Sequence, residues 1–531
     1  MRRHCLCKLL LLILLCVGLD CGVNAKVVMP TLFSDGMVLQ RGKPLAVYGQ
    51  ASASEDISLK FMKKVYRTKA DDHGNWSIQL PPQKAGGPYE MVINDVVIKD
   101  LLIGDVYLCS GQSNMELPVS RVMDKYKKEV LAYTNPMVRY IKVPLTYNFH
   151  EPQTDISKAS WKDITPENAM TFSAFAYFFA KEMYQRNKVP VGIINSSVGG
   201  SPVTAWMSDE ALADYPEYLN EKRICQSDEY IKNVKALDAQ HQFLWNATLN
   251  KSDVGRDGAA WKQVNMLDYS WAMNDEVPVN GSHWFSKGLE IPDSLSGREA
   301  VLRLGCIVDA DSTFVNGTFV GTVAYQYPPR IYKVPAGVLK AGKNNVTIRL
   351  ISYSGPAHFV PEKPYKMIIG GNEFDLSGEW SYHLGCRMPS LQGQTAFQYS
   401  PVGLYNGMIA PIERTQVKGV IWYQGESNTG HPSGYAELLT SMINDWRNKW
   451  NDQNLPFVIV ELPGFMTNHN KGVEDSWGKL RNEQAKVATT VKGTALAKAA
   501  DLGEWNDIHP LGKKDIALRA IDAMYKILPE K

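Results

Sequence analysis

The sequence has few cysteines and none of the common metal-binding spacings. Eight of its 531 residues are cysteine, and four of these, Cys5, Cys7, Cys16 and Cys21, lie within the first 25 residues. The remaining four are too few and too scattered for a disulfide framework. Neither a CxxC nor an HExxH spacing occurs. The sequence therefore predicts no metal site and no cofactor.

An excess of charge and a long hydrophobic run are missing as well. The formal net charge is +2 at pH 7, so nothing indicates nucleic acid or an anionic membrane surface as a partner. Beyond the N-terminus, no stretch approaches the roughly 18 apolar residues that a membrane-spanning helix needs. We expect neither a nucleic-acid partner nor a membrane span, and the oligomeric state stays open.

The N-terminus has the pattern of a signal peptide. Arg2, Arg3 and Lys8 precede the apolar run Leu9–Val17, and the small-residue segment Val23–Ala25 follows as a cleavage site. The apolar core of about nine residues is too short to span a membrane. We therefore expect export to the periplasm or the extracellular space.

The pattern of predicted strands and helices changes several times along the chain after residue 25. Short alternating runs separated by Gly, Pro and Asp turns predict a small β-sandwich, and strands alternating with helical patterns predict a parallel sheet. A β-rich stretch rich in aromatic residues then separates two regions of α/β texture. The predicted division is 1–25 signal peptide, 26–100 N-terminal β-sandwich, 101–220 first part of a hydrolase domain, 221–388 inserted β-sandwich, and 389–531 second part of the hydrolase domain.

The first chemically informative segment is GDVYLCSGQSNME, Gly104–Glu116. Its apolar start predicts a buried strand, and the small polar residues that follow predict a tight turn carrying Ser113. A serine at such a corner is exposed above the sheet edge, as an acyl-transfer nucleophile requires. Taken alone, these residues are more typical of an ordinary cap and turn than of a catalytic site.

The second segment is DLGEWNDIHPLGKK, Asp501–Lys514. His509 precedes a proline, which pushes its backbone toward an extended conformation. A histidine displayed on a loop with carboxylates beside it meets the requirements of a general base for the serine proton.

Two further turns follow apolar strands. Gly199 and Gly200, in VGIINSSVGGSPVTAW, would offer an unobstructed backbone N–H. Gln424 and Asn428, in GVIWYQGESN, carry side-chain amides that would donate hydrogen bonds to a developing oxyanion.

These blocks, in this order, resemble the conserved blocks of SGNH hydrolases. Their residues resemble more specifically those of the sialate O-acetylesterase group. The matching segments are GDVYLCSGQSNME, GGSPVTAW, LYNGMIAPI, KGVIWYQGESN and DLGEWNDIHP, which bracket the chain from residue 104 to about 515. The resemblance implies Ser113 as nucleophile and His509 as base. It implies an oxyanion hole formed by the Ser113 N–H, the Gly200 N–H and an amide side chain, Gln424 or alternatively Asn428.

The triad acid departs from the pattern of the family. SGNH enzymes usually carry it three residues before the histidine, where this chain has the neutral Asn506. Asp507 lies two residues before His509, and Asp501 lies further upstream. We favour Asp507, because a carboxylate both orients the ring and stabilises its cation. The alternative is a Ser–His dyad in which Asn506 or a backbone carbonyl orients the ring.

The β-rich stretch also carries a resemblance. Residues 309–323 and 330–350 resemble the jelly-roll sugar-binding domains that accompany many glycosidases. Because this stretch separates two catalytic blocks, we expect it to form a wall beside the active site. The expected fold class is an SGNH-hydrolase (flavodoxin-like) three-layer α/β domain with an N-terminal β-sandwich and an inserted jelly-roll β-sandwich.

The sequence thus predicts a secreted serine esterase that removes O-acetyl groups from carbohydrates. O-acetylated sialic acids are the substrate to which the resemblance points, and acetylated plant polysaccharides such as xylan or xyloglucan are the alternative. A non-catalytic glycan-binding protein on an esterase scaffold is the hypothesis from another class.

Overall fold

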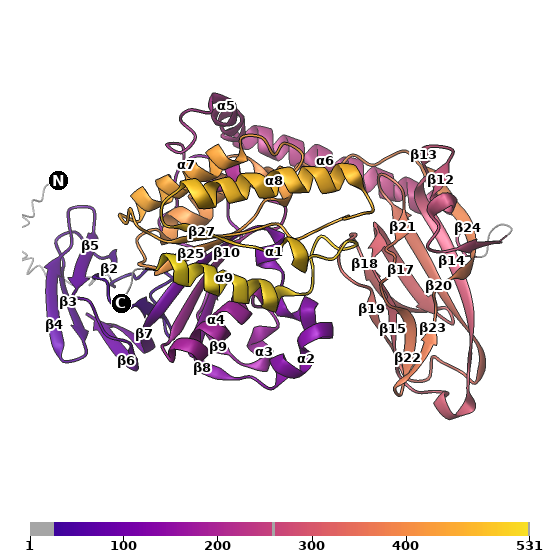
Figure 1. The fold of residues 1–531 in the computed structure, drawn as a ribbon, viewed down its shortest axis with the longest axis horizontal. Helices are drawn as coiled ribbons and strands as arrows, with labels where there is room; N and C mark the ends of the chain where they lie inside the picture. Colours follow the sequence, from indigo (N-terminus) through magenta and orange to yellow (C-terminus); the bar gives the residue numbers. More distant parts are fainter. Residues whose placement is uncertain (1–25, 257–260, 529–531) are drawn as a thin grey trace, which may run out of the picture.

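The computed structural model describes residues 26–256 and 261–528, and the predicted signal peptide lies outside them. Three parts follow one another in a row (Figure 1): strands from the N-terminal region, a central α/β part and a β-rich part. Within the described ranges, no helix has the length and apolarity that a bilayer crossing demands.

The N-terminal strands form two small sheets. Strand β2 pairs with β5, while β3 pairs with β4 and β6 in a sheet that continues into β7. Alternate residues of β5, Trp76, Ile78 and Leu80, are buried, as expected for a sheet with one solvated face. The strands are β1 (Val38–Gln40), β2 (Leu45–Gln50), β3 (Asp56–Phe61), β4 (Lys64–Lys69), β5 (Asn75–Leu80), β6 (Gly86–Ile93) and β7 (Val96–Gly111).

Strand β7 connects the N-terminal sheets to the central sheet. Its first half pairs with β6 and β1, and from Asp105 onward it pairs with β10 (Val191–Ser197) and β25 (Gly419–Tyr423). Asp105 is buried, and Arg41 (2.7 Å) and Lys418 (2.8 Å) neutralise its charge. A buried charge is tolerated only when it is paired. Arg41 follows β1 and Lys418 precedes β25, so the two ion pairs connect the N-terminal strands to the central sheet at this point of β7.

The central sheet has the order β27-β26-β25-β7-β10-β8-β9, and its strands are parallel except for β9. Successive side chains of β7 and β25 point to opposite faces, and both faces are buried by helices. Helices α4 and α9 cover one face, while α7 and α8 cover the other. The prediction of a layered α/β part is confirmed. The remaining strands of this sheet are β8 (Asn135–Lys142), β9 (Lys162–Ile164), β26 (Phe457–Val460) and β27 (Thr494–Ala497).

The helices of the central part connect these strands or follow them. They are α1 (Ser113–Glu116), α2 (Met123–Leu131), α3 (Pro166–Ala169), α4 (Ala174–Asn187), α7 (Tyr435–Lys449), α8 (Lys471–Thr490) and α9 (Lys513–Ile527).

The strand order corrects one prediction. A flavodoxin-like sheet has its first strand between the second and the third. Here the first parallel strand, β7, lies between the third, β10, and the fourth, β25, and β8 lies outside β10. The hydrophobic pattern could not distinguish these orders, because both bury the same strands.

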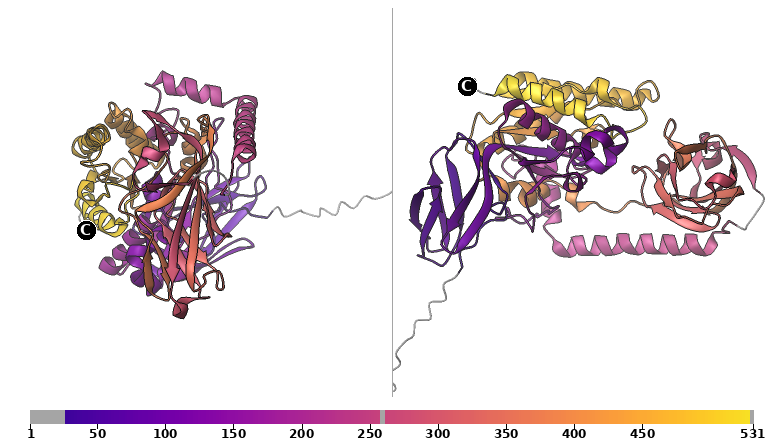
Figure 2. Two further views of the ribbon diagram at one scale, coloured as in Figure 1. Left: turned by 90° about the vertical axis from the view of Figure 1, so that its right-hand side faces the viewer. Right: turned by 90° about the horizontal axis from the view of Figure 1, so that it is seen from below.

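Two helices correct a second prediction, the β-rich texture from about residue 220. Residues 216–252 form α5 (Pro216–Cys225) and α6 (Asp228–Ser252), and α6 runs from the central part to the β-rich part (Figure 2). Only Trp245 and Leu249 of α6 are buried. Ile231, Val234, Trp245 and Leu249 nevertheless recur at helical spacing, and the prediction from sequence overlooked this pattern.

The β-rich part consists of two main sheets packed around one core. The six-stranded sheet has the order β11-β24-β14-β20-β17-β18, and the four-stranded sheet has the order β19-β15-β22-β23. Buried residues of both sheets, among them Phe285, Leu302, Ile348 and Met367, share one cluster. The strands are β11 (Lys262–Asn265), β12 (Met273–Asn274), β13 (Val277–Pro278), β14 (Asn280–Ile291), β15 (Ala300–Leu304), β16 (Ile307–Val308), β17 (Ala310–Val315), β18 (Thr318–Val323), β19 (Ile331–Val334), β20 (Gly342–Ser352), β21 (His358–Phe359), β22 (Tyr365–Ile369), β23 (Asn372–Asp375) and β24 (Glu379–Met388).

Candidate active site

Three polar turns meet at one edge of the central sheet. The strand register sets the ends of β10, β7 and β25 level, because Ser197 and Tyr423 both pair with Gly111. The residues that follow these ends are therefore neighbours in space. In an open parallel sheet, ligands bind beyond the carboxyl ends of the strands, where the strand order reverses. The reversal here lies beside β7, which leads into Ser113.

The side chain of Gln112 ties the serine turn to the turn after β25. Its Oε1 accepts hydrogen bonds from the N–H groups of Gly425 and Ser427, each at 3.2 Å. Its Nε2 donates to Ser427 Oγ at 3.3 Å. Because Gln112 is buried, these bonds are shielded from competing water. The position of Ser113 is therefore fixed from within the central part.

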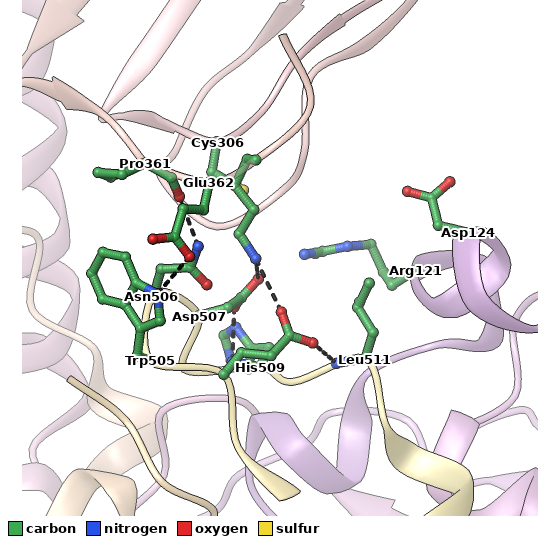
Figure 3. A network of polar contacts seen from close by, with 12 residues as sticks. Arg121, Asp124, Cys306, Pro361, Glu362, Trp505, Asn506, Asp507, His509 and Leu511 are labelled. Atoms are coloured by element: carbon green, nitrogen blue, oxygen red, sulfur yellow. Dashed lines mark hydrogen bonds and ion pairs between the residues drawn. The ribbon is translucent and has the colours of Figure 1, made fainter. Parts of the chain in front are cut away.

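The loop that carries His509 is held from the β-rich part (Figure 3). Lys363 Nζ donates to Glu504 Oε2 at 3.1 Å and to Asp507 Oδ2 at 3.0 Å. Asn506 Nδ2 donates to the backbone oxygen of Pro361 at 2.7 Å, and Trp505 Nε1 donates to Glu362 Oε2 at 2.9 Å. We call residues 361–363 the clamp segment. It contacts four consecutive residues of the loop, Glu504, Trp505, Asn506 and Asp507.

Ser113, Gly200 and His509 line one cavity of about 780 Å³. Tyr325 and Tyr327, from the β-rich part, line it as well, so that part supplies the expected wall. No hydrogen bond joins Ser113 to His509 among the described residues. Hydrogen bonds between catalytic groups are often long in the free enzyme and tighten in the complex with substrate, so the missing bond does not argue against proton transfer between these residues.

His509, the base predicted from sequence, is buried. It is 6 % exposed, and its Nδ1 is buried without a partner in the described part of the chain. The ring of Tyr327 meets it edge to face, with 5.0 Å between ring centroids. Burial, followed by the positive charges of Lys513 and Arg121, lowers the pKa of His509 to about 3. The ring is therefore neutral at pH 7 and able to accept a proton.

Asp507 does not lie where the predicted triad acid should. Its Oδ1 accepts the backbone N–H of His509 at 2.9 Å, and its Oδ2 accepts from Lys363. Neither oxygen is bonded to the imidazole ring, because the short Asp507–His509 turn directs the carboxylate back to the main chain. Asp501 is bound by Arg519 on the surface, and Asn506 is bonded to Pro361. Thus none of the three side chains considered from sequence orients the ring by a hydrogen bond.

The two glycines of the second turn differ in what their N–H groups do. The Gly199 N–H donates to Glu116 Oε2 at 2.7 Å. The Gly200 N–H has no acceptor among the described residues, and Gly200 lines the cavity. Its φ of +79° favours glycine, and a Cβ at this position would collide with the Tyr399 hydroxyl. Gly200, the glycine favoured from sequence, is therefore the one with an N–H left for a ligand.

Neither Gln424 nor Asn428 is among the residues that line this cavity, and the burial of Gln424 corrects its predicted exposure to the reacting group. Gln424 is fully buried, and its Nε2 donates to Gln112 Oε1, the Ser201 backbone oxygen and Asn428 Oδ1 at 3.1, 3.2 and 2.7 Å. Asn428 Oδ1 also accepts the Val203 N–H. Both amides thus join turns to one another. The sequence showed amides at the turn but not the acceptors that surround them.

Sequence reasoning missed a buried polar bridge beneath the site. Asn114 Nδ2 donates to Glu426 Oε1 and, at 2.9 Å, to the backbone oxygen of Ile508, while Asn114 Oδ1 accepts from Lys513 Nζ. Lys513 is fully buried, and burial lowers its pKa to about 7. Burial raises the pKa of Glu426. Asn114, Glu426 and Lys513 lie in the GQSN, GESN and HPLGK segments, and this position beside the predicted site residues was the signal in the sequence that could have identified the bridge.

Charged side chains also line the cavity. Glu116 Oε1 accepts from Lys142 Nζ at 3.0 Å, which pairs these two charges. Arg121 Nη2 donates to the Tyr327 backbone oxygen at 3.0 Å, and no carboxylate lies within ion-pair distance of Arg121 among the described residues. The cavity therefore offers a guanidinium beside Ser113 and His509. Within the same ranges, no group of three metal-ligating side chains comes together.

The chain is similar to known carbohydrate esterases. The family model described as carbohydrate esterase, sialic acid-specific acetylesterase matches residues 103–239 and 389–513. Sialate O-acetylesterase of Rattus norvegicus is 29% identical over an alignment of 300 residues, and the match covers 48% of this chain and 54% of the relative. The Homo sapiens enzyme is 29% identical over an alignment of 255 residues, and this match covers 43% of this chain and 47% of the relative. The chain thus spans about half the length of the curated relatives it matches.

A solved structure extends the similarity over nearly the whole chain. A carbohydrate acetylesterase from Xanthomonas citri is 25% identical with a TM-score of 0.58, over 95% of this chain and 75% of that one. The matched residues of the family model include Ser113, Gly200 and His509, the three residues that line the cavity together.

Proposed function

Residues 103–239 and 389–513 belong to the carbohydrate esterase family of sialic acid-specific acetylesterases, and from this premise we propose that the protein is an exported serine esterase that removes O-acetyl groups from sialic acids. The observation that carries the proposal is that Ser113, Gly200 and His509, from three distant segments, line one cavity. A protein that only binds glycans has no need of this combination.

The reaction follows from the groups in the cavity. Ser113 Oγ attacks the acetyl carbonyl carbon while His509 accepts the hydroxyl proton. The N–H groups of Ser113 and Gly200 hold the resulting oxyanion. Collapse of the tetrahedral intermediate breaks the bond to the sugar oxygen, which takes the proton from His509. Water then attacks the acetyl-enzyme, giving its proton to His509, and acetate leaves as Ser113 recovers a proton.

We propose that Ser113 and His509 act as a dyad. Asp507 is bound to the His509 backbone N–H and to Lys363, so it stabilises the loop in place of the ring. The ring of Tyr327 packs edge to face with the imidazole and restricts its rotation. A carboxylate hydrogen-bonded to the ring, as in a complete triad, would instead raise the basicity of the histidine.

The domain organisation belongs to the same proposal. Residues 101–220 and 389–531 form one SGNH-type hydrolase domain, residues 26–100 an N-terminal β-sandwich, and residues 221–388 an inserted domain of the jelly-roll class. The leader in residues 1–25 directs export. Acetylated plant polysaccharides remain the second substrate class, and the cationic Arg121 in the cavity favours the acidic sialic acids over these neutral chains.

Acetate release decides among these possibilities. We expect the wild type to hydrolyse p-nitrophenyl acetate and to release acetate from O-acetylated N-acetylneuraminic acid faster than from acetylated xylooligosaccharides, and Ser113→Ala to lose all three activities. Preference for the xylooligosaccharides would move the substrate to plant glycans. Binding of glycans without any turnover would leave the glycan-binding hypothesis.

A further inference from the structure

A second cavity lies between the β-rich part and the histidine loop. It has a volume of about 370 Å³, which is within the usual range for small-molecule sites. Tyr269, Gln326, Tyr327 and His358 line it from one side, and His469 and Trp505 line it from the other. We call it the junction cavity. Its two walls come from segments that the sequence separates by more than a hundred residues.

The junction cavity adjoins the catalytic cavity. Tyr327 and Ile508 line both cavities. Tyr327 also contacts His509 edge to face. A molecule in the junction cavity therefore lies one side chain away from a sugar whose acetyl group is at Ser113.

The lining combines aromatic faces with neutral polar groups. Tyr269 and Tyr327 are 49% and 38% exposed, large values for aromatic side chains at a cavity. The rings of His469 and Trp505 are stacked with centroids 3.5 Å apart, and Tyr269 lies beside His358 at 5.6 Å. His358 uses Nδ1 on the Pro356 backbone oxygen, which leaves Nε2 for a ligand.

Charge in this lining is largely neutralised. Asp507, which also lines the junction cavity, is paired with Lys363. Sugar rings present apolar C–H faces and hydroxyl edges, and a pocket of aromatic faces with a few placed hydrogen-bonding groups matches both. The clamp segment contacts the histidine loop, and these contacts fix the two walls of the junction cavity relative to each other.

We propose that the junction cavity binds the sugar next to the acetylated one, so that the enzyme acts on acetyl groups carried by a glycan chain in preference to those on a free monosaccharide. This inference rests on the proposed esterase activity and assigns it a second sugar subsite. Binding energy from this remote sugar raises kcat/KM without touching the reacting atoms.

A chain-length comparison tests the subsite. The substrates are O-acetylated N-acetylneuraminic acid and the same acetylated sugar in sialyllactose, together with acetylated xylose and acetylated xylotriose. For the pair that the wild type hydrolyses, we expect kcat/KM to be about tenfold higher for the chain than for the monosaccharide. Tyr269→Ala and His358→Ala should reduce this ratio to about twofold or less.

Matched variants separate the subsite from general damage. Tyr230→Ala and His241→Ala change exposed residues of α6, outside both cavities, and should keep the wild-type ratio. Tyr269→Phe retains the ring face and should restore most of the ratio. If Tyr269→Ala proves unstable, Tyr269→Phe and His358→Ala still test the ring face and the polar wall.

Failure of the inference and failure of the esterase proposal have different signatures. A wild type that hydrolyses p-nitrophenyl acetate and the sugars with a chain-to-monosaccharide ratio near one overturns the subsite alone. Equal losses of kcat/KM on both substrates in Tyr269→Ala also overturn it. If no substrate is turned over, the esterase proposal fails. Calorimetry with sialyllactose and xylotriose on the wild type and on Tyr269→Ala then tests the subsite. The subsite is overturned if the wild type binds neither sugar or if Tyr269→Ala binds as tightly as the wild type.

Discussion

The two halves of the candidate site are held in different ways. On the serine side, Gln112 joins turns that follow adjacent strands of one sheet, and its bonds are buried within the central part. On the histidine side, Lys363 and its neighbours hold the loop from the β-rich part. Ser113 is thus positioned by the sheet, whereas His509 is positioned by a contact between parts. The β-rich part is then a component of the candidate site.

The largest effect should come from removing either reacting group. Ser113→Ala and His509→Ala should each lower kcat on p-nitrophenyl acetate by about 10⁴-fold or more, and the double variant should be little worse, because the groups act as one unit. Circular dichroism should show both variants folded. Losses that multiply in the double variant would mean that the two halves work independently and would contradict their assignment to one step.

Breaking the serine side should destabilise the whole protein. Gln112→Ala removes the acceptor of the Gly425 and Ser427 N–H groups. Leaving a buried donor unsatisfied costs about 1–3 kcal/mol, so the free energy of unfolding in urea should fall by at least that amount. Gln240→Ala, at an exposed position of α6, is the matched control. An unchanged unfolding midpoint in Gln112→Ala would show that the buried hydrogen bonds of Gln112 do not stabilise the protein.

Breaking the histidine side should instead lower activity with little loss of global stability. Lys363→Met removes both ion pairs to the loop, and we expect kcat to fall by about 100-fold with KM nearly constant, because misplaced catalytic groups cost factors of this size. Lys363→Arg should recover most of the loss. Lys366→Met breaks the surface pair with Glu373 and should behave as wild type.

A wild-type kcat in Lys363→Met would show that the clamp segment does not position His509. A large fall in the unfolding midpoint of the same variant would show that the two sides do not differ in the way described above.

The dyad gives a smaller expected effect at Asp507. Asp507→Asn keeps an oxygen for the His509 N–H and loses only the charge that faces Lys363, so single-turnover acetate release should fall by about tenfold at most. Loss of a true triad aspartate costs about 10⁴-fold. A loss of that size, in a variant with unchanged stability, would restore Asp507 to the triad that the sequence predicts.

The smallest effect concerns pH. Because the pKa of His509 is lowered to about 3, the base stays neutral well below pH 7, and kcat/KM on p-nitrophenyl acetate should stay level from about pH 7 down to about pH 4. Arg121→Met removes a positive neighbour, which favours the protonated ring, so the acid limb should move to higher pH by less than about one unit. A shift to lower pH would contradict the predicted electrostatics.

The sequence predicted the serine side better than the histidine side, for a physical reason. A strand followed by a small polar turn is a local pattern, and the level ends of parallel strands bring Ser113 and Gly200 together. The partners of Asp507 depend instead on Lys363, 144 residues away in sequence. No local pattern records which carboxylate a distant lysine will bind.

The same distinction explains the other corrections. Gln424 and Asn428 were correctly placed at a turn, but the acceptors of the Gln424 amide and the donors to the Asn428 oxygen come from turns that only the fold assembles. Helix α6 is a different case, because its apolar residues recur at helical spacing from Ile231 to Leu249 and the pattern was present in the sequence. The bridge through Asn114 to Lys513 spans 399 residues and combines residue types that occur on many surfaces.

Peptide mapping of the acetyl-enzyme tests the central claim most directly. Wild-type protein mixed with p-nitrophenyl acetate or O-acetylated N-acetylneuraminic acid, quenched in acid within one turnover and digested, should carry one acetyl group on the peptide that contains Ser113. Ser113→Ala treated in the same way should carry none and should release no acetate. Turnover by Ser113→Ala, or an acetyl group on another residue that forms and decays at the rate of turnover, would contradict the account.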